Sequence, residues 1–327
     1  MEKTSKSFFK KHPFPRGRGP SENQQKWALE CFISAFRNRR EEGRESLRFI
    51  LSGLGNWYQS WKLIEEAIVL ADKLGFWGAV LPDHYMWGEN RGGNSTLETW
   101  VALTYLAART EKLKLGTLVT PIPFRPPGIL AKTISTVDLL SSGRAVLGVG
   151  AGWSQTEFEG YARWEDAKTR VDKTEEGVQL ILRLWQEQRV DHEGKYYHAK
   201  GAVLDPKPLQ KTHPPLLFGG VGLRMLKMAG RFADICFIAP WTQIPFGKAK
   251  DVVLQEARKT GRHDRLAFAM DTPRPQENFD LRESEKAVST AAREGCLYYV
   301  APFPQETFLD KMKQFAKEVM PSYAGLN

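Results

Sequence analysis

The sequence predicts an α/β protein with the architecture of a (β/α)8 TIM-type barrel, and three observations carry this prediction. From Leu47 onward, short apolar runs alternate with stretches in which apolar residues recur at helical spacing. Eight such pairs occupy about 270 residues, which is the length that a barrel of this kind needs. Hydrophobic residues make up 42% of the 327 residues, enough for one large core. An open, doubly wound sheet is the alternative that this pattern leaves open.

The predicted strands are short and rich in Val, Leu, Ile and Ala; they are Leu47–Leu51, Gly78–Leu81, Leu113–Val119, Ala145–Val149, Pro215–Phe218, Asp234–Ile238, Leu266–Met270 and Cys296–Val300. Each is followed by a predicted helix, and these are Trp61–Leu74, Leu97–Arg109, Gly128–Leu140, Thr169–Gln188, Leu223–Gly230, Phe246–Thr260, Ser284–Glu294 and Gln305–Glu318.

Two segments interrupt the alternation and are expected to be insertions, one after strand 4 and one after helix 4. Residues 151–168 are too polar and irregular to predict a helix, and 189–214 contain strand-like pieces at Lys195–His198 and Ala202–Leu204. The expected organisation is therefore a basic N-terminal arm and helix (1–46, with the helix over 21–42), a barrel (47–320) and a C-terminal tail (321–327).

The net charge of +9 lies mainly in the arm, because residues 1–48 hold 12 Lys and Arg against 6 Asp and Glu. The charge therefore constrains the barrel's active site only weakly, and a solvated or subunit-wrapping arm is favoured over one that binds nucleic acid. Apolar runs fall short of a membrane span, and the N-terminus lacks the apolar stretch of a secretory signal. The three cysteines form no CxxC pattern. We expect a cytoplasmic protein without a structural metal.

Glycine clusters follow two predicted strands. Gly148-Val-Gly-Ala-Gly-Trp153 is no dinucleotide fingerprint, because Trp153 stands where the third glycine is needed; by itself it indicates tight packing somewhat more than a ligand cradle. Gly219-Gly-Val-Gly222 precedes a predicted helix, whose N-terminus suits a phosphate. In a barrel, both clusters would lie at the active face.

Asp83 and His84 follow the second predicted strand, within Pro82-Asp-His-Tyr-Met-Trp87. Histidine titrates near neutrality and is the side chain best suited to proton transfer there, and a neighbouring carboxylate can orient it. An isolated Asp-His pair is usually a solvated loop feature. Its position at the end of a barrel strand, beside Tyr85 and Trp87, raises the catalytic interpretation to about equal weight.

Six ordered blocks of this sequence resemble the bacterial-luciferase-like oxidoreductases, over roughly residues 47–320. They are Gly75–His84, Ala108–Thr117, Pro123–Pro127, Asp138–Trp153, Asp205–Pro208 and Pro214–Gly222. Within that superfamily the sequence is most similar to the branch that uses the deazaflavin coenzyme F420, with members such as the methylenetetrahydromethanopterin reductases and the glucose-6-phosphate dehydrogenases. The resemblance implies a TIM-type barrel, a homodimer, and a cofactor ring at the carboxyl ends of the strands.

The resemblance also implies roles for particular residues. Asp83, His84 and Trp87 match the catalytic group, with His84 moving the proton. The positions that match the cofactor site are Asp83, Thr117, Leu118, Val119, Ala151, Gly152, Trp153, Gly219, Gly220, Val221 and Gly222. Among these, the third-strand end often carries a non-proline cis peptide that presses on the ring, and the last four residues match the phosphate loop.

Trp153 departs from the sugar-phosphate dehydrogenases, which have a catalytic Glu at this position, and this points to another substrate. The leading hypothesis is hydride transfer between coenzyme F420 and an organic substrate, with Arg125 and Arg224 meeting the acidic tail of the cofactor. An FMN-dependent monooxygenase is the second hypothesis, because both cofactors present a similar tricycle and a phosphate. A non-catalytic cofactor- or nucleic-acid-binding protein is the third.

Overall fold

The computed structural model describes residues 46–55, 60–86, 96–239, 242–271 and 279–323. The predicted arm and helix over residues 1–45 lie outside the described residues, as does Trp87. Residues 45–327 form one compact unit. Within it, parallel strands follow one another in the order β3-β2-β1-β11-β10-β9-β8-β5, and β3 pairs with β5. This last pairing closes the sheet into a barrel, which confirms the predicted fold and excludes the open sheet.

The barrel strands agree with the predicted ones to within a few residues; they are β1 (Arg48–Ser52), β2 (Gly78–Leu81), β3 (Lys114–Thr117), β5 (Ala145–Gly150), β8 (Leu216–Gly219), β9 (Ile235–Phe237), β10 (Ala267–Asp271) and β11 (Tyr298–Pro302). A two-residue strand, β4 (Thr120–Pro121), pairs with the end of β5 and lies in the loop after β3.

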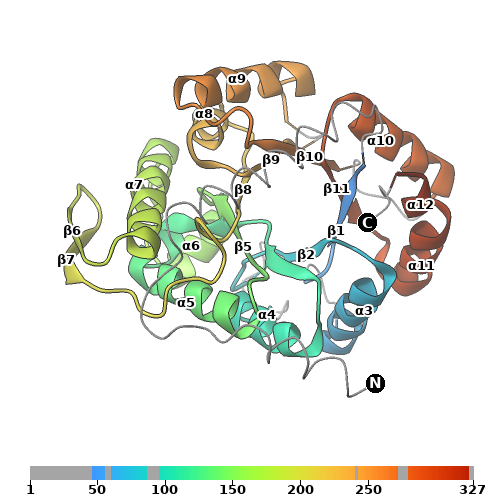
Figure 1. Ribbon diagram of the computed structural model, residues 1–327, viewed down its shortest axis with the longest axis horizontal. Coiled ribbons are helices and arrows are strands. Elements are labelled where there is room, and N and C mark those ends of the chain that lie inside the picture. Colours follow the sequence, from blue (N-terminus) through green and yellow to red (C-terminus); the bar gives the residue numbers. More distant parts are fainter. Residues whose placement is uncertain (1–45, 56–59, 87–95, 240–241, 272–278, 324–327) are drawn as a thin grey trace, which may run out of the picture. The chain divides into compact units, whose positions relative to one another are not determined.

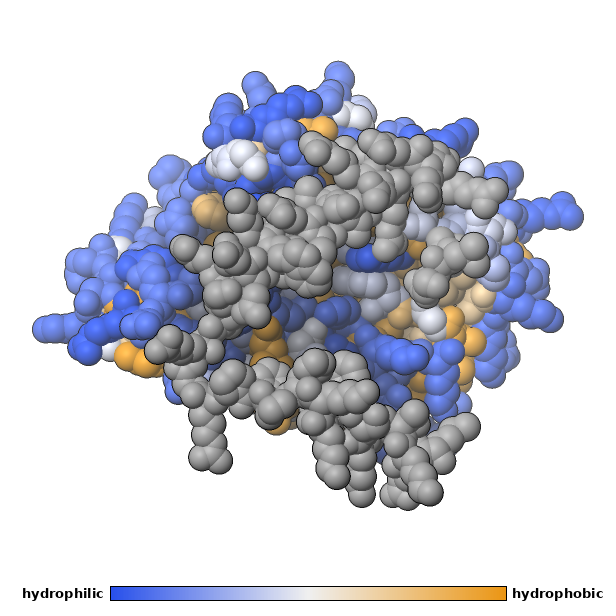
Figure 2. All heavy atoms as spheres, viewed as in Figure 1, coloured by the Kyte–Doolittle hydropathy of each residue, from blue (hydrophilic) through white to orange (hydrophobic). Residues whose placement is uncertain are grey.

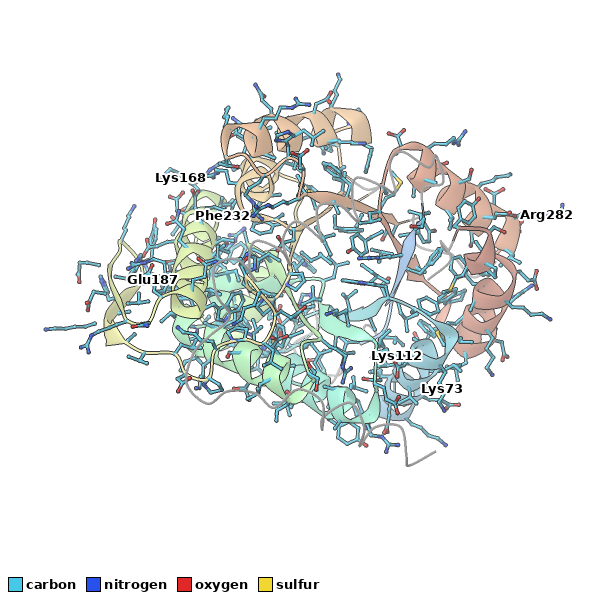
Figure 3. The ribbon with its side chains drawn as sticks, viewed as in Figure 1. Lys73, Lys112, Lys168, Glu187, Phe232 and Arg282 are labelled. Atoms are coloured by element: carbon cyan, nitrogen blue, oxygen red, sulfur yellow. The ribbon has the colours of Figure 1, made fainter. Side chains whose placement is uncertain are left out.

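Helices surround the strands (Figure 1). They are α3 (Trp61–Leu74), α4 (Thr99–Arg109), α5 (Pro127–Leu140), α6 (Gln155–Tyr161), α7 (Ala167–Gln186), α8 (Leu223–Phe232), α9 (Phe246–Lys259), α10 (Leu281–Arg293), α11 (Phe308–Glu318) and α12 (Met320–Tyr323), with short 3-10 turns η1 (Ile122–Phe124) and η2 (Gln305–Thr307). Hydrophilic side chains cover most of α7 and α9 on the face shown in Figure 2. Charged residues such as Lys73, Glu187 and Arg282 point away from the barrel (Figure 3).

The strands are apolar on both faces because each face is buried. Ile50 belongs to the cluster inside the barrel, while its neighbours Phe49 and Leu51 belong to the cluster between the strands and the helices. Side chains of a strand alternate between its two faces, so both sets must be apolar. This explains why the strand segments are continuous apolar runs in the sequence.

Glycines allow β3 and β5 to approach each other where the barrel closes. A methyl group on Gly148 would lie 1.9 Å from the carbonyl oxygen of Thr117, and one on Gly116 would lie 2.3 Å from that of Val146. Both distances are far below van der Waals contact. Gly148 therefore serves packing, which is the interpretation that its sequence context favours.

Two predictions for the insertions were wrong. Residues 155–161 form helix α6, which is polar because its inner face carries Glu157, a buried carboxylate. In the second insertion the strands are β6 (Val190–Glu193) and β7 (His198–Ala202), so the expected strand at Lys195–His198 is mostly a turn. The Glu176 carboxylate accepts hydrogen bonds from the backbone N–H groups of Tyr196 and Tyr197 and holds this turn. Polar strands of this kind, which are only partly buried, lack the apolar alternation that predicts a strand.

The chain's end also differs from the prediction, since residues 321–323 of the expected tail belong to α12. The carbonyl oxygen of Tyr323 accepts a hydrogen bond from the backbone N–H of Leu47 at 2.9 Å. This contact ties α12 to the start of β1. Among the described residues, we find no helix with the length and apolar character needed to span a membrane.

Candidate active site

The residues predicted for the site come from the carboxyl ends of four barrel strands. Asp83 and His84 follow β2, Leu118 and Val119 follow β3, Ala151 to Trp153 follow β5, and Gly220 to Gly222 follow β8. Because the strands are parallel, these ends lie at one edge of the barrel, where TIM-barrel enzymes build their active sites.

Val119, which follows β3, packs against glycines at the ends of β5 and β8. A methyl group on Gly150 would lie 2.4 Å from Val119 Cγ2, and one on Gly219 would lie 2.8 Å from Val119 Cγ1. The Leu118–Val119 peptide bond is cis, as the resemblance implies. Thr117, by contrast, is fully buried, and its hydroxyl bonds to Thr120 and to the backbone of Gly148. The Leu118–Val119 peptide and the glycines around it therefore form a compact floor at this edge.

His84 is held by a glutamate that lies 73 residues further along the chain. Its Nδ1 atom is 2.7 Å from Glu157 Oε2, and the side chains of the two residues are 10% and 2% exposed. The backbone N–H of Tyr85 donates to Glu157 Oε1 at 2.5 Å, which fixes the carboxylate. A carboxylate accepts hydrogen bonds, so Nδ1 carries the proton in the neutral ring.

Trp153 stands beside this histidine. The ring centroids of His84 and Trp153 are 5.8 Å apart and the planes meet at 71°. Trp153 is 69% exposed, although it follows a fully buried strand. The left-handed backbone of Gly152, with φ of +79°, turns the chain at this position. An indole that is mostly exposed thus lies beside the candidate proton-transfer group.

Asp83 is buried and engaged by Arg125. The guanidinium donates to both Asp83 oxygens, at 2.8 and 2.7 Å, and Thr120 Oγ1 donates a third bond at 2.8 Å. Arg125 also donates to Glu98. Burial alone would lower the pKa of Arg125, but the hydrogen bonds and charges of Asp83 and Glu98 outweigh burial and raise that pKa. Removing one partner of a buried pair typically costs about 3–5 kcal/mol, so this pair anchors the loop that carries His84.

These contacts change the expectation for the two arginines. Arg125 is committed to Asp83 and Glu98, and its guanidinium lies 5.0 Å from the centre of the Tyr85 ring. Arg224 pairs with Asp172 on α7. That these residues meet an acidic cofactor tail stays a prediction; Arg125, whose side chain is 14% exposed, would have to share its guanidinium with Asp83 and Glu98. For Arg224 the tail would have to compete with Asp172.

Aromatic side chains pack behind the loop that follows β2. Tyr85 lies 4.8 Å from Phe124 and 5.1 Å from Tyr161, and Phe124 lies 4.8 Å from Phe158, measured between ring centroids. Burial is the largest of the effects that raise the pKa of Tyr85. Contacts of this kind are worth about 0.5–1.5 kcal/mol each beyond burial and hold α6 against the loop.

The loop Gly219–Gly222 opens helix α8, as predicted. Gly222 is the N-cap, and no described side chain forms a capping hydrogen bond there. A methyl group on Gly222 would meet no described atom within 4 Å, and Val221 is 47% exposed. The first N–H groups of a helix have no intrahelical acceptor and carry partial positive charge. This helix end can therefore receive a phosphate.

Sequence reasoning missed Glu157 and the role of Arg125. One signal was present for Glu157, because Trp153, Glu157 and Tyr161 are spaced four residues apart, which places residues on one face of a helix. The pairing of Asp83 with Arg125 spans 42 residues and has no local signal. Trp87 lies outside the described residues, so its predicted part in the site stays a prediction.

The fold and the site together define a TIM-barrel protein with a buried His-Glu pair and an open helix N-terminus at the carboxyl ends of its strands. The sequence profile of the family described as "Luciferase-like monooxygenase" matches residues 17–276. The chain therefore belongs to this family, and the resemblance in the sequence is confirmed.

Curated relatives include the F420-dependent glucose-6-phosphate dehydrogenases of Microbacterium testaceum and Nocardia farcinica. The first is 35% identical over 168 residues, which are 51% of this chain and 49% of the relative. The second is 34% identical over 203 residues, which are 60% of this chain and 59% of the relative. The chain thus spans about half to three fifths of the length of these relatives.

Solved structures share the fold at 20% identity. An F420-dependent secondary alcohol dehydrogenase in complex with an F420-acetone adduct has a TM-score of 0.72 and covers 86% of this chain and 100% of its own. The coenzyme F420 dependent tetrahydromethanopterin reductase of Methanopyrus kandleri has a TM-score of 0.67, with coverages of 85% and 99%. The monooxygenase RslO1 of Streptomyces bottropensis has a TM-score of 0.69, with coverages of 85% and 100%.

Proposed function

We propose that this chain is an oxidoreductase that transfers a hydride between coenzyme F420 and a small organic substrate. The observation that carries the proposal is the buried His84–Glu157 pair at the carboxyl edge of the barrel, the same edge that carries the helix end suited to a phosphate. Curated relatives that are 34–35% identical are named as F420-dependent enzymes, which supports this cofactor.

The residues at the barrel edge fit such a cofactor. Leu118 and Val119 offer a partly exposed apolar floor for a flat ring, and Gly150, which precedes Ala151 and Gly152, packs against Val119. The uncapped N-terminus of α8 offers backbone N–H groups for the phosphate, in the loop Gly219–Gly222. When bound, the deazaflavin supplies a carbon that gives or takes a hydride in a two-electron step.

His84 moves the proton that accompanies the hydride. Glu157 keeps Nδ1 protonated, so Nε2 gives a proton when the ring is charged and takes one when it is neutral. Asp83 acts as a positioning residue through Arg125, because its oxygens are already engaged. Trp87 completes the proposed catalytic group.

An FMN-dependent monooxygenase is the second candidate. The monooxygenase RslO1 shares this fold with a TM-score of 0.69, and the matching family carries a monooxygenase description. The same floor and the same helix end suit FMN, because it also combines a flat tricycle with a phosphate. Coenzyme F420 is favoured over FMN because these curated relatives are named as F420-dependent enzymes.

Titration of the purified chain with each cofactor tests the proposal. We expect coenzyme F420 to bind at least about tenfold more tightly than FMN, equivalent to about 1.4 kcal/mol. Fluorescence of the bound cofactor reports the dissociation constant, and riboflavin, which lacks the phosphate, is the control for the helix-end contact. Tighter binding of FMN would favour the monooxygenase instead.

We also propose that the chain acts as a homodimer. Helices α4 and α5 leave apolar side chains open, among them Val101 and Ile129, which are 69% and 68% exposed. Neighbouring exposed apolar residues are typical of subunit interfaces. Sedimentation velocity should give about twice the 37.1 kDa mass of one chain, and a monomer at micromolar concentration would contradict the proposal.

A further inference from the structure

The interior of the barrel changes character at the amino ends of its strands. Further along the strands it is lined by apolar residues such as Ile50, Val80 and Val300. Side chains two residues apart on a strand share a face, so Arg48 on β1 and Tyr298 on β11 lie on this inward face, one layer nearer the amino edge. Interior layers of such barrels are usually filled by branched apolar side chains, so a cation in this layer is unusual.

A second cation, Lys114 on β3, faces the same interior. Lys114 pairs with Gly78 of β2, which lies two residues before the inward Val80, and a methyl group on Gly78 would lie 3.2 Å from Lys114 Cβ. The carbonyl oxygen of Trp77 accepts a hydrogen bond from the backbone N–H of Lys114 at 3.0 Å. The Trp77 ring packs edge to face against the Tyr298 ring, with centroids 4.8 Å apart. These contiguous residues form what we call the amino-edge cluster, namely Arg48, Trp77, Lys114 and Tyr298.

Hydrogen-bond donors outnumber acceptors among the side chains of the amino-edge cluster. Arg48 donates to the Tyr298 hydroxyl oxygen at 3.2 Å, through one of its N–H groups. Tyr298 is 5% exposed, and in the part of the chain that the structure describes its own hydroxyl hydrogen has no acceptor. A buried donor without an acceptor is costly, so the cluster favours a ligand that accepts hydrogen bonds.

Among the described residues, no carboxylate forms an ion pair with either cation of the cluster. Lys114 Nζ donates to two neutral oxygens, the Gly143 carbonyl at 2.6 Å and the Gln210 side-chain amide at 2.9 Å. Gln210 lies between Lys114 and the Asp138 carboxylate, to which its NH2 group donates at 2.7 Å. Burial is the largest effect that lowers the pKa of Lys114, and the charge of Arg48 adds to it, while Asp138 opposes it. An anion beside both cations would relieve their repulsion.

We propose that the amino-edge cluster binds a phosphate group, free or carried by a small phosphomonoester, at the edge of the barrel opposite to the proposed cofactor site. A phosphate offers several acceptor oxygens and about two negative charges at neutral pH, which match the two cations and the hydroxyl donor. The Arg48 guanidinium and the Lys114 ammonium pair with its oxygens, and the Tyr298 hydroxyl donates a further hydrogen bond. This binding is separate from hydride transfer and does not depend on it.

Titration of the full chain with sodium phosphate and with glycerol phosphate tests this site. The indole N–H signal of Trp77, assigned with the Trp77→Phe variant, reports binding in proton–nitrogen correlation spectra, because the indole lies beside Tyr298. At constant ionic strength we expect a saturable shift with a dissociation constant of about 1 mM or below. The tighter ligand identifies the source of the phosphate group. The absence of a saturable shift overturns the inference, and an equal shift with chloride indicates an adventitious ion only and overturns it too.

Variants of the amino-edge cluster locate the bound phosphate. Arg48→Gln removes a cation and should raise the dissociation constant at least about tenfold. Tyr298→Phe removes only the hydroxyl group and should raise it about threefold or more. Lys112→Gln is the matched control, because it removes an exposed cation two residues before Lys114, and should change the dissociation constant less than about twofold. Equal weakening by Lys112→Gln and Arg48→Gln would show a general effect of charge and overturn the inference.

The indole signal of Trp153 reports the opposite, carboxyl edge of the barrel. A shift of Trp153 alone would place the phosphate at that edge, which overturns the inference and leaves the proposed function standing. A shift of Trp77 that Arg48→Gln weakens supports the amino-edge site, even if the chain fails to bind coenzyme F420 in the separate titration. That failure would overturn only the proposed function.

Discussion

Replacement of His84 with alanine is expected to lower kcat by about 10²- to 10⁴-fold, the usual contribution of a general acid or base. His84 is the residue that we propose moves the proton, and its Nδ1 is held by Glu157 at 2.7 Å. The dissociation constant for coenzyme F420 should change less than threefold, since the proposed cofactor contacts come mainly from other strand ends. Steady-state kinetics and cofactor titration measure the two effects separately.

A second histidine serves as the control for this experiment. His198 lies in β7, with its side chain 61% exposed, and its replacement with alanine should leave kcat within about twofold. Wild-type turnover by His84→Ala would remove His84 from the mechanism. A parallel loss of cofactor binding would instead indicate that His84 holds the ring.

Replacement of Glu157 with glutamine is expected to lower kcat by about 10²-fold with little change in KM. The glutamine oxygen can still accept a hydrogen bond from the backbone N–H of Tyr85, which in the unaltered chain donates to Glu157 Oε1 at 2.5 Å. Its NH2 group, however, would face His84 Nδ1 and favour the tautomer that protonates Nε2. In serine proteases, replacing the carboxylate that orients the histidine with an amide lowers kcat because the histidine takes the wrong tautomer. Steady-state kinetics give the split between kcat and KM.

The glutamine variant also separates positioning from stability. Because Glu157→Gln retains the side-chain shape, its melting temperature should fall by only a few degrees. Glu157→Ala removes a buried partner, so its melting temperature should fall further. Glu159→Gln, on the exposed side of α6, is the matched control and should leave kcat unchanged. If Glu157→Gln kept full turnover, the proposed positioning role would be wrong.

The sequence alone predicted the barrel because its signals are local. Apolar runs and helical spacing recur within each segment, and the buried strands need apolar residues on both faces; all eight predicted strands and their helices are present. The order of these elements also placed Asp83, His84, Trp153 and Gly222 at the carboxyl edge. Helix α6 and strand β6 were missed because their polar residues give no apolar period.

Only the tertiary structure decided which polar groups meet. His84 and Glu157 are 73 residues apart and Asp83 and Arg125 are 42 apart, and a buried charged residue has the same letter in the sequence as an exposed one. Whether a carboxylate is buried, and which partner then compensates its lost hydration, depends on how distant strands are brought together by the closure of β3 on β5. The sequence thus determined the barrel and the edge that carries the site, and the folded chain decided that Asp83 anchors the loop while Glu157 orients the histidine.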